Sequence, residues 1–397
     1  MTERFDGSFT QQLAIPEAGI DAAMRVLKSG RLHRYNVAAG DPGEAALVEE
    51  EFAAWLGARY CLALASGGAA MSTALRAAGV GSGDAVLTNA FTLAPVPGAV
   101  AAVGGRAIFV ESTDNLTIDF DDLARKAGGA GARVLLISHM RGHLCDMERL
   151  VAVCEAHGLT LIEDCAHTMG GAWLGRKSGL WGALACFSTQ TYKHMNSGEG
   201  GFLTGDDPAL MARAVILSGS YMNYERHRAA PPPEAFSAVR YDMPNISSRM
   251  DNLRAAILRP QIARLDDDCA AWTARYRVIE EGLRGLPQVA LTRRPQAETF
   301  VGSSIQFRLP GWSPAQIQRL LAGAAARGVE LKWFGAPEAH GFTATHHHWR
   351  FAPAQQLPAT DAIMATLLDM RIPLTFSLDD CRLIARVLAA EIGCGGA

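Results

Sequence analysis

The residues of this sequence best placed to do chemistry are an aspartate and a lysine that follow two neighbouring apolar segments. Asp164 follows the segment 159–163, and Lys193 comes shortly after the segment 185–188, which ends at Ser188. Near-continuous apolar segments of this length predict buried parallel strands, whose carboxyl ends meet at one edge of a sheet. We therefore expect the two side chains to project at the same edge.

A carboxylate and a lysine buried together can form a simple ion pair, and spacing alone favours that structural interpretation. The functional alternative is a pyridoxal phosphate (PLP) site. There the lysine amine forms a Schiff base with the cofactor aldehyde, and the carboxylate keeps the pyridine nitrogen protonated. Residues 65–70 (ASGGAA) favour this alternative, because glycines at a strand-to-helix turn let backbone N–H groups approach a phosphate.

Strands and helices alternate over the first two thirds of the chain and would position these residues. The apolar runs predict strands at 61–65, 85–88, 107–110, 134–138, 159–163, 185–188 and 201–204. Helices are predicted between them at 68–78, 121–126, 147–157 (with Asp146 as N-cap) and 208–217. This alternation predicts an α/β fold with a three-layer, doubly wound, mostly parallel sheet, whose ligands bind beyond the carboxyl ends of the strands.

The pattern changes after residue 205 and predicts a second, smaller domain. We expect a large domain over 1–250 with an N-terminal substrate or interface segment, a long connecting helix over 251–285 that is interrupted at Pro260, and a small α+β domain over 286–397. The stretch 221–242, with its run of prolines, is expected to be an irregular loop. In the small domain, strands are predicted at 304–309 and 371–374, and helices from Ser313 and Leu378.

Composition excludes several classes of protein. The chain has 397 residues, a net charge of −3 and 49% hydrophobic residues, which indicates a globular protein and argues against a nucleic-acid binder. The eight cysteines include no C-x-x-C pair and follow no secretory segment, so we expect reduced, mostly buried thiols in a cytoplasmic enzyme. The uncharged stretch 85–105 contains prolines, glycines and polar residues, which fit a strand, a turn and a short helix better than a membrane span.

Four further patterns carry little weight. No G-x-G-x-x-G follows the first strand, and the P-loop-like stretch 170–178 has Lys177 one position late and no strand directly before it. Three adjacent histidines, 346–348, cannot all face one ion in a regular element, so we expect a solvated loop. His139 and His143 follow a strand, where their spacing does not bring side chains to one face, which favours a structural or substrate-loop role.

Taken together, the aspartate, the lysine and the glycine-containing turn make the sequence resemble the DegT/DnrJ/StrS family of PLP-dependent sugar aminotransferases. These enzymes have the aspartate aminotransferase fold (fold type I). The resemblance runs from about Ala14 to Ile392. It is carried by 162–167 (IEDCAH), by Phe187 and Ser188 with Lys193 five residues on, by 198–201 (GEGG) and by 249–256 (RMDNLRAA).

The resemblance implies roles for individual residues. Lys193 would be the Schiff-base lysine and proton shuttle, Asp164 the partner of the pyridinium and His167 a neighbour of the ring. The residues that it implies for cofactor binding are Gly67, Gly68, Ala69, Phe91, Leu93, Asp164, His167, Ser188, Lys193, Asn245 and Ser247. No metal is implied. The protein would be a cytoplasmic homodimer with shared active sites, acting in sugar or secondary-metabolite biosynthesis.

The sequence departs from the family pattern at four places. Gly68 stands where the family has a phosphate-binding threonine, and Leu93 where it has an aromatic that stacks on the cofactor, with Phe91 two residues away. Ser247 stands in place of an asparagine that reaches the phosphate from the partner subunit, with Asn245 two positions earlier. The N-terminal substrate loop, 30–36, also differs.

The family reaction would move an amino group from L-glutamate or L-glutamine to a nucleotide-linked keto sugar or a keto cyclitol. Candidate contacts to the acceptor are His33, Arg34, Tyr35, Lys332 and Trp333. Two alternatives stay open. The first is a PLP-dependent sugar dehydratase, whose family members carry histidine at the lysine position, and the second is a non-catalytic PLP-fold protein with a binding or regulatory role.

Overall fold

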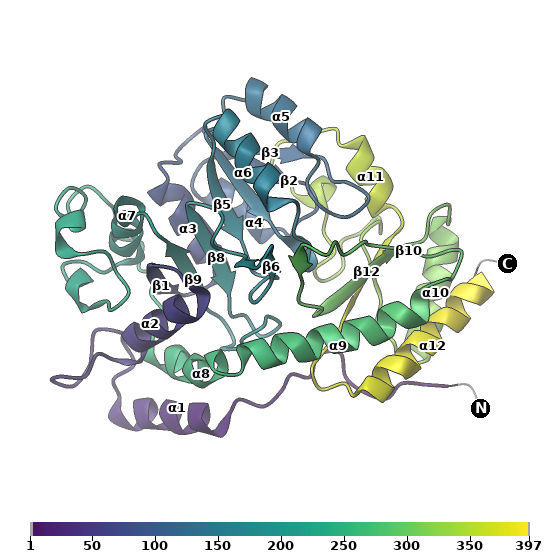
Figure 1. The fold of residues 1–397 in the computed structure, drawn as a ribbon, viewed down its shortest axis with the longest axis horizontal. Coiled ribbons are helices and arrows are strands. Elements are labelled where there is room, and N and C mark those ends of the chain that lie inside the picture. Colours follow the sequence, from purple (N-terminus) through teal and green to yellow (C-terminus); the bar gives the residue numbers. More distant parts are fainter. Residues whose placement is uncertain (1–2, 396–397) are drawn as a thin grey trace.

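The computed structural model describes residues 3–395 and has two main sheets with helices around them (Figure 1). The larger sheet has seven strands in the order β1-β9-β8-β5-β4-β2-β3. Its strands are β1 (Tyr60–Leu64), β2 (Ala85–Asn89), β3 (Arg106–Val110), β4 (Val134–Ser138), β5 (Thr160–Asp164), β8 (Leu184–Ser188) and β9 (Gly201–Gly205). Only β9 runs antiparallel to its neighbours, so the predicted mostly parallel sheet is confirmed.

Both faces of this sheet are covered, because successive strand residues point to opposite sides. In β1, Leu62 and Leu64 pack into the core beneath α3 and α7, while Cys61 and Ala63 pack with Phe52 of α2 on the other face. The helices around the sheet are α2 (Glu44–Leu56), α3 (Gly67–Ala77), α4 (Pro95–Ala102), α5 (Phe120–Gly129), α6 (Met147–Ala156) and α7 (Pro208–Ser218). The three predicted layers are therefore present.

The C-terminal part contains a four-stranded antiparallel sheet of order β10-β12-β14-β13. Its elements are β10 (Ala290–Leu291), β12 (Ser304–Arg308), β13 (Lys332–Trp333), β14 (Leu367–Arg371), α10 (Pro314–Ala326), α11 (Pro358–Met364) and α12 (Leu378–Gly395). The strand predicted at 371–374 is wrong, because the observed strand ends at Arg371 and shares only that residue with the prediction. Leu368 and Met370 are the residues that alternate into the core, and Pro373 has no N–H for a sheet ladder.

The helical stretch predicted over 251–285 consists of two helices, α8 (Asn252–Ile262) and α9 (Leu265–Leu283), and the break follows Ile262 instead of falling at Pro260. Pro260 lies inside α8, where it removes one backbone donor, and that helix ends two residues later. Asp266, Asp267 and Asp268 in the first turn of α9 favour a new helix start. α9 runs beside α12, and α1 (Glu17–Ser29) packs against α8 (Figure 1). The proposed domain boundaries stay a prediction.

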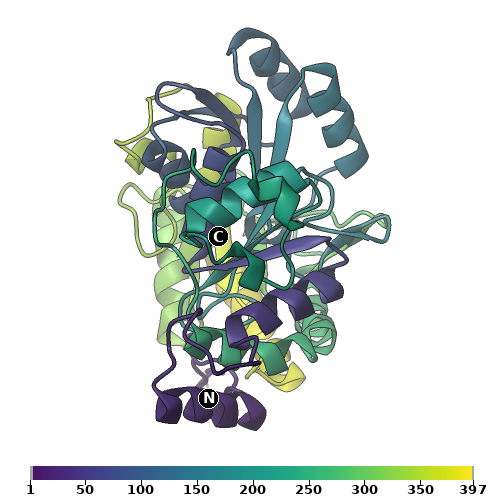
Figure 2. The same ribbon diagram turned by 90° about the vertical axis from the view of Figure 1, so that its left-hand side faces the viewer.

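The remaining elements are short. A three-stranded sheet joins β11 (Glu298–Thr299), β6 (Ala172–Trp173) and β7 (Arg176–Lys177), so the P-loop-like stretch is a hairpin. The 3-10 helices are η1 (Met140–Gly142), η2 (Tyr224–Arg226), η3 (Pro233–Phe236) and η4 (His346–His348). In a view turned by 90°, α1 and α5 lie at opposite ends of the molecule (Figure 2).

The structure can be compared with two expectations, one for residues 85–105 and one for the cysteines. Residues 85–105 form β2, a turn and α4, and within residues 3–395 no helix is long and apolar enough to cross a membrane. Seven of the eight cysteine thiols are buried, and Cys394 near the end of α12 is exposed.

Candidate active site

A cavity of about 490 Å³ lies at the carboxyl edge of the large sheet, where the loops after β1, β2, β4, β5 and β8 meet. This is the edge at which open α/β sheets bind ligands. The predicted site residues that line it are Gly67, Gly68, Leu93, Asp164, His167, Ser188 and Lys193. The structure thus brings the aspartate and the lysine into one cavity, as the strand order predicts.

Lys193 directs its amine at His167, with 2.9 Å between Nζ and Nε2. Burial, together with the positive charges of Arg141 and Arg371, lowers the pKa of Lys193 to about 7, against the opposing effect of Asp164. Burial and the neighbouring lysine hold the pKa of His167 well below its usual range. Near neutral pH, His167 is therefore a neutral imidazole that accepts a hydrogen bond from an amine able to lose its proton.

Asp164 is the last residue of β5, and its carboxylate is fixed by two donors. The Ser138 hydroxyl donates to Oδ2 at 2.9 Å, and the Ala166 N–H donates to Oδ1 at 3.2 Å. The residue before it, Glu163, points to the opposite face of the sheet, since strand side chains alternate. There it is fully buried and accepts backbone N–H groups of the turn 179–182. One carboxylate thus faces the cavity, while its neighbour holds the adjoining turn.

The first turn of α3 forms one end of the cavity. Ser66 caps the helix, and its hydroxyl accepts the Ala69 N–H at 3.0 Å. The N–H groups of Gly67 and Gly68 have no partner within the helix because of their position in the first turn. A β-carbon on Gly67 would lie 2.8 Å from the Ser188 β-carbon, so the turn packs closely on the end of β8. This end of the cavity suits an anion, which the N–H groups of Gly67 and Gly68 can bind. The Ala69 N–H is not available, because it already donates to the Ser66 hydroxyl.

Four residues implied by the resemblance do not line the cavity: Ala69, which directly follows Gly68 in α3, and three that lie elsewhere. Phe91 is buried in a separate apolar cluster with its ring against Phe334, so Leu93 rather than Phe91 faces the cavity. Asn245 and Ser247 do not line the cavity. The Asn245 amide oxygen accepts the Ser247 N–H at 3.0 Å, which makes a local turn in an exposed loop.

None of the candidate acceptor contacts is among the residues that line the cavity. Arg34 is buried in a bidentate pair with Glu49, and Tyr35 is hydrogen-bonded to His227, so both stabilise the N-terminal loop. Trp333 donates to the Ala365 carbonyl at 2.8 Å. His33 and Lys332 are not among the lining residues either.

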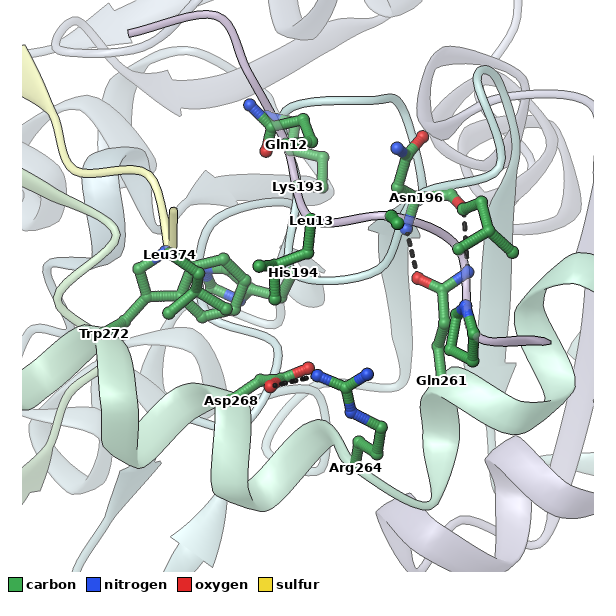
Figure 3. Close-up of a pocket in the computed structure, with 13 residues that line it drawn as sticks. Gln12, Leu13, Lys193, His194, Asn196, Gln261, Arg264, Asp268, Trp272 and Leu374 are labelled. Carbon is green, nitrogen blue, oxygen red and sulfur yellow. Dashed lines mark hydrogen bonds and ion pairs between the residues drawn. The ribbon is translucent and has the colours of Figure 1, made fainter. Parts of the chain in front are cut away.

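A second, smaller cavity of about 50 Å³ lies beside the loop that carries Lys193 (Figure 3). It has room for only a few water molecules. Gln261 bonds the backbone of Asn196 twice, as acceptor and as donor, at 2.8 Å each. His194, the neighbour of Lys193, bonds the Met169 carbonyl and the Ser303 hydroxyl. These contacts hold the loop in place, and the cavity belongs to its support.

The histidines singled out in the sequence form hydrogen bonds or ion pairs with other side chains of the fold. His139 pairs with Glu163, while His143 bonds Gln306 at 2.8 Å, so the two rings have different partners. The stretch 346–348 forms η4 rather than the expected solvated loop, because His346 is buried and bonds Asp361 at 2.8 Å, as does His347.

The model of the DegT/DnrJ/EryC1/StrS aminotransferase family matches residues 17–389. The chain belongs to this family. The family predicted from the sequence is therefore confirmed.

Individual relatives of this aminotransferase-family chain are named for sugar and cyclitol substrates. The dTDP-3-amino-3,4,6-trideoxy-alpha-D-glucose transaminase of Streptomyces venezuelae is 33% identical, over 69% of this chain and 68% of that protein. The L-glutamine:2-deoxy-scyllo-inosose aminotransferase of Streptomyces kanamyceticus is 32% identical, over 62% of this chain and 58% of that protein. The match spans between 56% and 67% of the length of the first curated relatives. The solved structure of S. venezuelae DesV superposes with a TM-score of 0.79 at 25% identity, covering 100% of both chains.

Sequence reasoning missed four side chains that line or support the cavity of this family member. Ser138 ends a predicted strand at the same edge as Asp164, so its position could have revealed it. Arg141 lies between His139 and His143, and nothing in the spacing of these residues signals a cavity. Tyr192 precedes the lysine, and Arg371 enters from β14, whose bounds were predicted wrongly.

Arg141 adopts an unusual backbone conformation in η1, with φ of 55°. A left-handed conformation costs a non-glycine residue roughly 1–2 kcal/mol. The loop is anchored on its far side, where Arg294 donates to the Gly142 carbonyl at 2.7 Å. Such strain persists only where the surrounding structure fixes it, and it is common at ligand sites.

Proposed function

We propose that this chain is a PLP-dependent aminotransferase that transfers an amino group from L-glutamate or L-glutamine to a keto sugar, nucleotide-linked in some relatives, or to a keto cyclitol. The observation that carries the proposal is one cavity lined by both Asp164 and Lys193, in which the pKa of Lys193 is lowered to about 7. The printed names of the relatives support the choice of donor and acceptor.

The residues present fit PLP. The N–H groups of Gly67 and Gly68, the positive end of α3 and the Ser188 hydroxyl suit a phosphate group. The close packing of Gly67 on Ser188 leaves no room for a β-carbon there and brings the backbone up to the cavity wall. Asp164, held by the Ser138 hydroxyl, suits a protonated ring nitrogen, and Lys193 offers a primary amine. When bound, PLP supplies an aldehyde that accepts an amine and a ring that withdraws electrons.

The protein's own part is to place charges and move protons. Asp164, at the end of β5, directs its carboxyl group toward the cavity, where the Ser138 hydroxyl fixes it. Lys193 Nζ, neutral for much of the time near pH 7, takes the proton from the donor α-carbon and later returns a proton to the acceptor carbon. His167 stays neutral and orients the amine through its 2.9 Å hydrogen bond. Leu93 and Met140 exclude water from the apolar wall.

We further propose a cytoplasmic homodimer in which Asn245 or Ser247 of the second subunit reaches the phosphate. In support, both residues lie in an exposed loop, and α1 carries the exposed apolar residues Ile20, Met24 and Leu27. Apolar residues of this kind on one helix are typical of a surface that another chain covers.

Trapping the cofactor tests the assigned lysine. The protein incubated with PLP is expected to be yellow and to lose its colour with borohydride, leaving a phosphopyridoxyl group on the peptide that contains Lys193, as measured by mass spectrometry. Lys193→Ala should give neither colour nor adduct at that position, and amino transfer from L-glutamate should fall at least about 100-fold, since general acid–base catalysis contributes about this much or more.

Two results would contradict the proposal. A Lys193→Ala protein that still aminated a ketone would reject the role of the lysine. A wild-type protein that bound PLP but showed no spectral change with any amino donor would instead favour the non-catalytic alternative. The dehydratase alternative has no supporting observation, because a lysine occupies the position where those family members carry histidine.

A further inference from the structure

The three adjacent histidines, 346–348, have no part in the amino transfer proposed above. They form η4, which contacts α11. His346, His347 and Asp361 of α11 bring two ring nitrogens and a carboxylate oxygen within 4.8 Å of one another. None of the three residues lines the cavity. The proposed reaction therefore does not explain why these side chains gather.

Both rings of the cluster converge on the same oxygen atom. His346 Nε2 and His347 Nε2 each lie 2.8 Å from Asp361 Oδ1, and the ring centroids are 3.9 Å apart. In the described part of the chain, no hydrogen bond reaches the other oxygen, Oδ2. Two imidazoles that needed only an acceptor could use both oxygens of a carboxylate. Convergence of two nitrogens and one oxygen on a single point is instead the arrangement of ligands around an ion.

The spacing of the three atoms is close to the spacing that a metal requires. Bonds from Zn²⁺ to histidine nitrogen and to carboxylate oxygen measure about 2.0–2.2 Å, so tetrahedral coordination separates the ligand atoms by about 3.3 Å. The ring nitrogens would therefore move away from the oxygen by only about 0.5 Å. Small rotations about side-chain bonds supply such a shift and leave the backbone in place.

Two of the three side chains are held by the fold, and the third opens the cluster to solvent. The His346 side chain is 3% exposed, and its ring lies beside that of Phe109. Asp361 is placed by α11, whose first turn donates two backbone N–H groups to Glu111. The His347 side chain is 61% exposed. An ion can enter from this side and keep a water molecule in its remaining position.

His348, the third histidine of the run, is turned away from the cluster. Its Nδ1 accepts the Thr345 N–H at 3.0 Å, and its Nε2 lies 3.3 Å from the Pro337 carbonyl oxygen. His348 thereby ties η4 to the segment 337–345. Phe342 of this segment lines the cavity, so whatever fixes η4 also fixes one part of the cavity wall.

We propose that His346, His347 and Asp361 bind a divalent transition-metal ion, and that Zn²⁺ is the ion that these ligands suit best. Imidazole nitrogens suit Zn²⁺, whereas Mg²⁺ and Ca²⁺ take mainly oxygen ligands. Zn²⁺ also accepts three protein ligands with water in the fourth position. The ion fastens η4 to α11, and with η4 the segment that carries Phe342. The site is separate from amino transfer, for which the family resemblance implies no metal.

Zinc binding by the full-length, PLP-loaded protein, made without a polyhistidine tag, tests the proposal. Equilibrium dialysis against zinc chloride, with the metal measured by atomic absorption, is expected to give one tightly bound ion per chain. His347→Ala and Asp361→Asn should each weaken binding at least about 10-fold, because even the loss of a residue that only orients a metal ligand costs about 10- to 100-fold. His157→Ala, which removes an exposed histidine after α6, is the matched control and should bind zinc as wild type does.

Hydrogen exchange measured by mass spectrometry locates the ion. Zinc should slow the exchange of backbone amides in 337–361 of the wild-type protein, because the ion joins η4 to α11 and makes local opening less frequent. The same addition should leave the exchange of this segment unchanged in His347→Ala.

Three results overturn the proposal. The first is the absence of saturable zinc uptake by the wild-type protein, a result that needs no variant. The second is binding that survives in either variant, which would place the ion elsewhere, at the exposed thiol of Cys394 or among the buried His139, Glu163 and Cys165. The third is zinc that slows exchange only outside 337–361. None of these measurements uses amino transfer, so their failure leaves the proposed function untouched.

Discussion

At the scale of single residues, the site depends on how the protein changes the protonation of one amine. Lys193 lies in a loop that Gln261 holds from one side and His167 contacts from the other. Burial and two arginines favour the uncharged amine, and Asp164 opposes them without reversing the effect. A lysine that can lose its proton near neutral pH can serve as a base there.

The lowered pKa of Lys193 predicts how stability depends on pH. The pKa falls from 10.5 in the unfolded chain to about 7 in the fold, so between these values the unfolded state binds more protons and stability rises with pH. Lys193→Met removes this contribution. Urea unfolding of the PLP-free proteins should show a gain in the free energy of unfolding over wild type that is largest near pH 7 and shrinks toward pH 9.5.

Lys28→Met, on the exposed side of α1, is the matched control for losing a lysine. A difference between Lys193→Met and wild type that stayed constant from pH 7 to 9.5, or grew, would show that the amine is not held uncharged by the fold.

At the scale of elements, the start of α3 determines how a phosphate can be held. The family threonine is replaced by Gly68, whose added β-carbon would meet only the Ser66 hydroxyl, at 3.7 Å. There is room for a side chain, and the N–H groups of the first turn already point to the cavity end. The departure seen in the sequence is therefore one that a substitution can reverse.

Gly68→Thr is expected to bind PLP more tightly, by about 2- to 10-fold, because one hydrogen bond contributes roughly 0.5–1.5 kcal/mol. A spectrophotometric titration of the cofactor-free protein measures the change. Gly68→Ala is the matched control, since it alters the backbone in the same way but adds no hydroxyl, and it should not tighten binding. Gly67→Ala should weaken binding, because its β-carbon would meet the one of Ser188 at 2.8 Å. Unchanged affinity in Gly68→Thr would place the phosphate elsewhere.

Prediction from sequence succeeded for elements whose signal is local. The strand at 134–138 and the N-cap Asp146 are as predicted, because an apolar run and a capping side chain depend only on residues that are adjacent in the sequence. The break between α8 and α9 was misplaced, since Pro260 is accommodated in the last turn of α8. At the site, Asp164 and Lys193 could be paired from strand order, whereas Arg141 and Arg371 depend on how the two sheets pack, which no short stretch of sequence encodes.

At the scale of the whole molecule, the cavity joins the two sheets. The large sheet supplies the aspartate, the lysine and the phosphate-binding turn, and the small sheet supplies Arg371 and, through Asp369, the ion pair to Arg141. The proposed partner subunit would complete the site from the loop around Asn245. Binding of a substrate in this cavity would therefore depend on the relative placement of both sheets, more than binding of the cofactor phosphate would.

The burial of the cysteines gives the molecule a single natural attachment point for a probe. Seven thiols are buried, and their solvent access is lost with folding, while Cys394 stays exposed at the end of α12. A thiol reagent should therefore report one fast-reacting group in the native protein and all eight after denaturation. A fluorophore or spin label coupled to the untouched wild-type chain would then sit at one known position, so that distances across a dimer could be measured without engineering a single residue.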